Sequence, residues 1–226
     1  MTLLVQYTLI YASVLILVAL GGCFAEHSGV INLGLEGIMI MGALGGALTL
    51  KYLCAAWQGV PAIVLILSAV LVAALVGLIY SLLLSVACGE HPQAANSVGI
   101  SVYKMRYAGV MISGVLGGIG GIAYITAGVS EWKFEGGVAG FGFLALAVMI
   151  FGQWKPTRIA LAALLFGLFR ALSNVYSGIG FLANLNISSS IYNMMPYVIS
   201  LIVLAFTSKK SRAPKAEGIP YDKGQR

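Results

Sequence analysis

Four polar side chains stand inside long apolar stretches of this chain, and they are the groups that could do chemistry there. They are Glu36, Arg170, Asn174 and Asn193. Enzymatic chemistry calls for groups that act together, such as paired carboxylates, a serine–lysine dyad, an HExxH motif or a histidine cluster, and the sequence has none of these. An enzyme is therefore disfavoured and no cofactor is expected. Polar groups at membrane depth instead indicate a solute path or helix contacts.

Glu36 closes a polar, glycine-rich segment, residues 26–37, and an apolar run follows it at once. A carboxylate there is costly unless it is paired, hydrogen-bonded or facing a wet cavity. Two interpretations fit equally well. Glu36 lines a pore or positions a helix, or it lies at a helix N-terminus near water, where the helix dipole stabilises it.

The elements that must hold these residues are membrane helices. The 226 residues are 60% hydrophobic and only 9% charged, against about 25% charged in soluble domains. A crossing needs about 20 apolar residues. We expect an all-α polytopic bundle in one domain, residues 1–207, in which the short segment 138–151 crosses or re-enters. The seven expected segments are 5–24, 38–57, 61–87, 107–127, 138–151, 159–178 and 191–207.

Positive charge predicts the orientation, because lysine and arginine concentrate on the cytoplasmic side. Lys104 with Arg106, Lys155 with Arg158, and the basic tail 208–226 fall on one side if every segment crosses. The N-terminus then lies outside. The tail is short and lacks interleaved aromatic residues, so nucleic-acid binding is disfavoured.

Two further patterns concern packing and metal chemistry. Glycines four residues apart predict close helix contacts, and the pairs are Gly42 with Gly46, Gly114 with Gly118, and Gly117 with Gly121. The three cysteines form no CxxC pair and have no histidine at ligand spacing, which disfavours metal binding.

The longest stretch between apolar segments is 88–106. Pro92 suits the first turn of a short helix, and Gly99 suits the residue after its end. Ala94 and Ala95 would then share a small face that fits a groove on a partner protein. Spacing alone favours an ordinary loop.

Three segments taken together resemble the permease family of bacterial ABC importers for nucleosides and simple sugars, in the branched-chain amino acid and ribose-type superfamily. They read SGVINLGLEG at 28–37, GEHPQAANSVGISVYKMRY at 89–107, and GFGFLALA with IFGQWKP at 140–147 and 150–156. Any one motif is weak, but three in the right order are specific. The resemblance covers most of residues 10–85 and 88–207.

The resemblance implies a multi-pass protein of the plasma (inner) membrane that works with partners. These are an ABC ATPase subunit, a second permease subunit in a homo- or heterodimer, an external substrate-binding lipoprotein and membrane lipid. The ATPase would dock on the segment 88–106, through Gly89, Glu90, Pro92, Ala94, Ala95, Gly99, Lys104 and Arg106. A translocation path would include Asn32, Glu36, Phe143 and Asn174. The sequence has no Gly-x-x-x-x-Gly-Lys-Ser/Thr loop, so ATP is expected on the partner.

One feature departs from the family pattern. Relatives carry more membrane spans between the equivalents of Leu83 and Cys88, which here are almost adjacent. This join predicts an internal deletion and leaves an alternative open, a truncated permease that inserts without transporting. The glycine-rich segments 30–50 and 136–151 stand in comparable positions, which also predicts an inverted repeat.

Overall fold

The computed structural model describes residues 2–87, 102–128, 133–179, 188–207 and 213–214, and the regular structure in these ranges is helical. Each of the seven expected segments forms an α-helix. A π-helical turn, Tyr124–Gly128, extends the fourth helix, and 3-10 turns lie at Phe134–Gly136 and Tyr176–Gly178. The α-helices are α1 (Thr2–His27), α2 (Leu35–Ala56), α3 (Ala62–Ala87), α4 (Val102–Ala123), α5 (Phe141–Phe151), α6 (Pro156–Val175) and α8 (Ser189–Thr207).

Five helices in the described part of the chain are long and apolar enough to cross a membrane: α1, α2, α3, α6, and α4 with its π-helical extension. The shorter helix α5 has 11 residues and rises about 16 Å, roughly half the thickness of the hydrocarbon core. Helix α8 is not among the five. The helical membrane fold is thus confirmed, and five of the seven expected crossings meet the requirement for a span.

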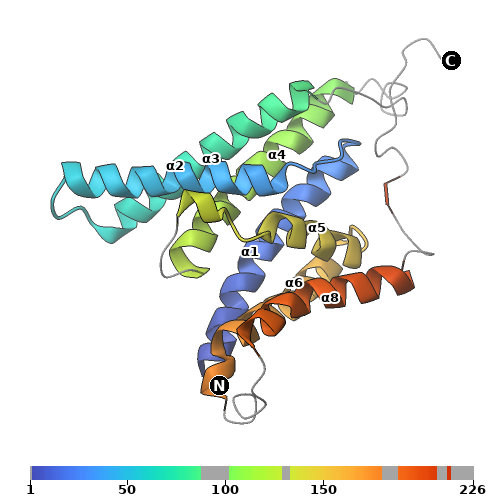
Figure 1. Cartoon of the computed structure of the whole chain (residues 1–226). Helices are drawn as coiled ribbons and strands as arrows, with labels where there is room; N and C mark the ends of the chain where they lie inside the picture. Colours follow the sequence, from blue (N-terminus) through green and yellow to red (C-terminus); the bar gives the residue numbers. More distant parts are fainter. Residues whose placement is uncertain (1, 88–101, 129–132, 180–187, 208–212, 215–226) are drawn as a thin grey trace.

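Helix α1 runs between two groups of helices and contacts both (Figure 1). On one side, α2, α3 and α4 pack against one another. On the other side, α6 contacts α5 and α8. The buried core follows α1 and fills the space toward α5 and α6, where Leu15, Phe141 and Phe166 are fully buried.

The first group is packed through glycine, as the four-residue spacing predicts. A Cβ atom on Gly42 of α2 would collide with the backbone of Gly118 in α4, and one on Gly118 would collide with the carbonyl of Ala73 in α3. Gly118 therefore allows three helix backbones to approach at one level, which is the contact that small residues provide in membranes.

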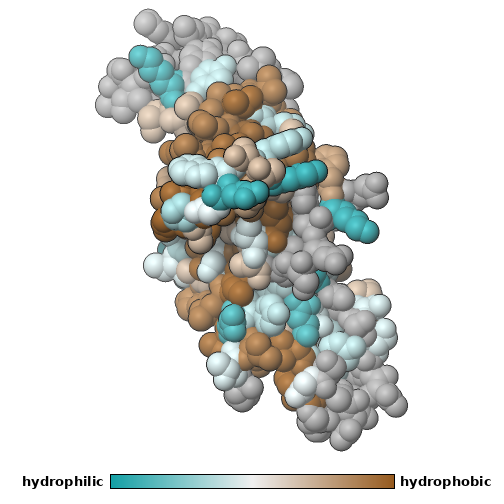
Figure 2. Space-filling model, turned by 90° about the vertical axis from the view of Figure 1, so that its left-hand side faces the viewer, coloured by the Kyte–Doolittle hydropathy of each residue, from teal (hydrophilic) through white to brown (hydrophobic). Residues whose placement is uncertain are grey.

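The outer surface of α3 is a row of exposed apolar side chains four residues apart. It consists of Ile63, Leu67, Leu71, Leu75, Ile79 and Leu83. Figure 2 shows hydrophobic residues over much of the face that it views, with a few hydrophilic side chains between them. A surface of this kind is suited to lipid rather than water.

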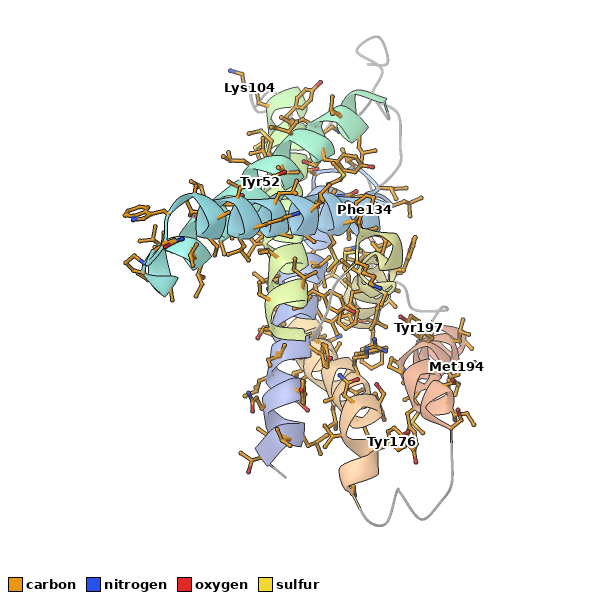
Figure 3. The ribbon with its side chains drawn as sticks, turned by 60° about the vertical axis from the view of Figure 1, so that its left-hand side comes forward. Tyr52, Lys104, Phe134, Tyr176, Met194 and Tyr197 are labelled. Atoms are coloured by element: carbon orange, nitrogen blue, oxygen red, sulfur yellow. The ribbon has the colours of Figure 1, made fainter. Side chains whose placement is uncertain are left out.

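The end of the expected loop 88–106 is helical, because α4 begins at Val102. Residues 88–101, with the predicted Pro92–Gly99 helix, lie outside the described residues. Lys104 and Arg106 consequently belong to the first turns of a membrane helix. Lys104 is exposed and points away from the bundle (Figure 3), whereas Arg106 is buried.

Candidate translocation site

The short helix α5 is bracketed by residues in the left-handed backbone region. Ala139 (φ 54°) and Gly140 (φ 76°) precede it, and Gln153 (φ 51°) and Trp154 (φ 56°) follow it. This conformation costs a non-glycine residue about 1–2 kcal/mol. Such residues persist only where their surroundings hold them in place, so the contacts at both ends of α5 matter.

Glu36 holds the N-terminal end of α5. Its Oε1 accepts a hydrogen bond from the Gly140 amide at 3.0 Å, and its Oε2 accepts one from the Gly142 amide at 2.6 Å. The first amides of a helix have no partner within the helix, and the helix dipole favours an anion there. Glu36 lies in the first turn of α2 but stabilises the N-terminus of α5. It contacts a helix start, as the helix-positioning half of the first interpretation requires, and it lies at helix N-termini, as the second requires.

Gly142 makes this contact sterically feasible. A Cβ atom at position 142 would collide with the Glu36 backbone. The two helix starts therefore meet through a glycine on one side and a carboxylate on the other.

Glu26 holds the other end of α5. The Trp154 indole Nε1 donates a hydrogen bond to Glu26 Oε2 at 2.5 Å, and the Cys23 thiol donates to the Trp154 carbonyl at 3.5 Å. The Glu26 side chain is only 4% exposed, and a buried carboxylate is tolerated where hydrogen bonds satisfy it. The stretch from Glu26 to Glu36 thus supplies a carboxylate to each end of α5.

Aromatic rings gather around Phe141 at the first turn of α5. The ring centroid of Tyr11 lies 5.6 Å away and that of Tyr124 lies 4.6 Å away. The Arg170 guanidinium lies 5.5 Å from the Phe141 centroid and is hydrogen-bonded to Tyr124. A cation over an aromatic face is attracted by the ring quadrupole. Arg170 therefore lies against protein, as the cost of a cation in lipid leads one to expect.

Two further hydrogen bonds tie this aromatic cluster to its neighbours. The Asn174 amide of α6 donates to the Tyr11 hydroxyl, and the Tyr197 hydroxyl of α8 donates to the Ala139 carbonyl at 3.0 Å. Tyr197 and Met194 both lie on α8 (Figure 3). Tyr197 contacts the start of α5, whereas Met194 is 58% exposed. Side chains from α1, α5, α6 and α8 meet here.

The structure links two of the four residues predicted to line a path. Glu36 accepts a hydrogen bond from the first turn of α5, where the Phe141 ring packs against Tyr11. Tyr11 in turn accepts a hydrogen bond from Asn174. Asn32 is buried elsewhere, where its amide donates to the Ser113 hydroxyl at 2.7 Å. Phe143 lies on the outside of α5 and is 59% exposed. A role in solute passage remains a prediction for all four.

Sequence reasoning missed several residues of this site, among them Glu26, Tyr11, Tyr124 and Trp154. Glu26 carries a readable signal, because a carboxylate beside an apolar run needs a partner just as Glu36 does. The tyrosines and the tryptophan carry none, since aromatic residues are common in membrane helices. In the part of the chain that the structure describes, no three His, Cys, Asp or Glu side chains could hold a metal.

A known family matches the chain in two pieces. The family described as "Branched-chain amino acid transport system / permease component" matches residues 4–86 and again residues 83–206. Together the two pieces cover nearly the whole chain. They meet at residues 83–86, where the join was predicted.

Curated relatives show the same pattern. The guanosine ABC transporter permease protein NupQ of Bacillus subtilis is 32% identical over 319 positions, covering 100% of this chain and 98% of NupQ. Those 319 positions exceed the 226 residues of this chain by 93, so a long stretch of NupQ has no counterpart. The nucleoside ABC transporter permease protein NupC of Lactococcus lactis is 47% identical over 61% of this chain and 42% of NupC.

The aligned part thus spans less than half of NupC. The extra positions in the NupQ alignment, with two family matches that meet at residues 83–86, indicate that this chain lacks a stretch that NupQ carries. Its origin as an internal deletion remains a prediction. A third relative, provisionally assigned as a glucose ABC transporter permease protein (TsgC13 of Haloferax volcanii), is 39% identical over 38% of this chain and 26% of its own length. No solved structure matches the chain.

Proposed function

This chain belongs to the permease-component family of branched-chain amino acid transport systems, and we propose that it is the membrane subunit of an ATP-driven importer of nucleosides. The observation that carries the substrate class is the similarity to NupQ along the whole chain and to NupC at 47% identity. A simple sugar is second, because the glucose-assigned relative matches a much smaller share.

The cluster around α5 suits such a solute. A nucleoside presents a flat, aromatic base and several hydroxyl groups. Aromatic side chains favour stacking on a base, and amide or guanidinium groups donate to oxygen acceptors. Asn174 is exposed, and Arg170 and Tyr197 are half-buried at the edge of the cluster. We therefore place the solute path along this edge of α5, α6 and α8.

The partners follow from the same assignment. An external binding lipoprotein would deliver the solute, a second permease subunit would complete the path, and an ABC ATPase would dock on residues 89–106. Within that segment, Lys104 is exposed and points away from the bundle. Replacing Ala95 with glutamate should abolish co-purification with the ATPase while membrane insertion persists, and unchanged co-purification would remove this docking assignment.

The test of transport is uptake of radiolabelled guanosine into cells that lack their own nucleoside importers. The cells express this chain with its ATPase, second permease and binding lipoprotein. We expect ATP-dependent uptake that is weaker than with a full-length relative. The reason is that this chain lacks those 93 positions, at which relatives are expected to carry helices that wall the path. Polar groups left facing lipid cost several kcal/mol each.

The outcomes separate the two candidate functions. Glucose uptake without guanosine uptake would show that the substrate is a simple sugar rather than a nucleoside. Insertion of the chain with no uptake of either solute would favour the truncated, non-transporting permease. Uptake equal to that of a full-length relative would show that the missing positions are dispensable.

A further inference from the structure

A cavity of about 270 Å³ lies between the C-terminal turns of α1 and the turn that joins α5 to α6. Its lining is almost entirely apolar, and the residues are Leu20, Cys23, Phe24, His27, Trp154 and Pro156. The cavity is open on one side. It lies away from the aromatic cluster around Phe141, and nothing in the proposed transport function makes use of it.

The position of the cavity indicates what fills it. α1 ends at His27 and α6 begins at Pro156, and both helices are long and apolar enough to span a membrane. The ends of two spans lie at the boundary between hydrocarbon and head groups. Phe24 at the rim is 49% exposed. An apolar opening at this depth suits an acyl chain.

The rim of the cavity is basic. Lys155 lies between two lining residues, and both Lys155 and Arg158 are exposed. The Arg158 Nη1 donates to Gln153 Oε1 at 2.9 Å, which keeps the guanidinium beside the turn. Among residues 20–27 and 152–160 the one carboxylate is that of Glu26, and it is buried against the Trp154 indole. The exposed charge at this rim is therefore positive.

We propose that this cavity is a binding site for an anionic phospholipid. One acyl chain fills the apolar cavity, and the phosphate of the head group lies beside Lys155 and Arg158. Basic sites between membrane helices recognise anionic head groups in this way, and a guanidinium matches phosphate oxygens with two parallel hydrogen bonds. The site needs neither the transported solute nor the ATPase.

Native mass spectrometry of the purified full-length chain tests the proposal. The protein is exposed to equal amounts of phosphatidylglycerol and phosphatidylethanolamine with identical acyl chains. We expect phosphatidylglycerol to be enriched on the protein. The Lys155→Gln/Arg158→Gln variant should lose this enrichment, by about fivefold for each cation removed. Lys51→Gln is the matched control, because Lys51 is an exposed lysine on α2, away from the cavity, and it should bind as the wild type does.

Two further arms separate the acyl chain from the phosphate. Cys23→Phe fills the cavity and should weaken binding of both lipids, with helix content by circular dichroism as the check on folding. Inorganic phosphate should not displace bound phosphatidylglycerol. The proposal is overturned if the double variant keeps the enrichment, if the Lys51 control loses it equally, or if inorganic phosphate alone displaces the lipid. None of these results depends on nucleoside uptake.

Discussion

The two groups of helices on either side of α1 are held together by different means. In α2, α3 and α4 the closest contacts bring backbone against backbone, and Gly118 touches both neighbouring helices. Around α5, α6 and α8, side-chain hydrogen bonds and ring contacts such as Glu36 on Gly142 and Arg170 on Phe141 are added to the backbone contact at Gly142. A backbone contact allows no added atom. A side-chain contact can be lost singly while the rest of the region stays in place.

The largest effect is expected where the backbones touch. Gly118→Leu puts a branched side chain into the Ala73 carbonyl and the Gly77 backbone. Overpacking costs up to about 3 kcal/mol where neighbouring side chains can move aside. The cost is higher here because the neighbouring atoms belong to the backbone, which cannot move aside in the same way. We expect loss of the folded protein, measured as a collapse of the monodisperse peak in size-exclusion chromatography in detergent. Gly136→Leu is the control, because nothing lies within 4 Å of a Cβ there. Equal tolerance of both changes would remove the distinction between the two groups.

An intermediate effect is expected at the N-terminus of α5. Glu36→Ala removes both acceptors from the Gly140 and Gly142 amides. Hydrogen bonds to charged groups contribute about 1.5–3 kcal/mol each, so losing two of them should speed up exchange of the first amides of α5 with deuterium by at least roughly 150-fold. Exchange in α3 and α4 should stay unchanged. Glu36→Gln keeps one acceptor and should fall between the wild type and alanine. Uniform acceleration through all helices would show that the two groups unfold as one.

The smallest effect is expected at the other end of the same helix. Trp154→Phe keeps the ring but removes the indole donor to Glu26. The loss of one hydrogen bond to a buried carboxylate costs about 1.5–3 kcal/mol, less than the loss of two at Glu36, and should appear as a fall in thermal stability in detergent. Trp57→Phe is the matched control, since Trp57 is 57% exposed at the end of α2. A fall of the same size in both variants would mean that the Glu26 contact contributes nothing of its own.

The helices could be predicted from the sequence, whereas most of the site could not. Apolar runs fix a membrane helix to within a few residues, because each turn satisfies its own backbone in lipid. The glycine pairs were readable because their four-residue spacing is local. Glu36 could be recognised as a carboxylate in need of a partner, but that partner lies 104 positions away at Gly140. Tyr11 and Asn174, 163 positions apart, are joined by folding alone.

The short stretch from Glu26 to Glu36 also determines how α5 is able to move. Glu26 and Glu36, only ten positions apart in the chain, hold the two ends of α5. A displacement of the Trp154 turn is therefore shared at once by the end of α1 and the beginning of α2. We therefore expect α5 and this stretch to move together as one rigid unit. A displacement at Lys155 is then transmitted to the aromatic cluster with little bending of α5.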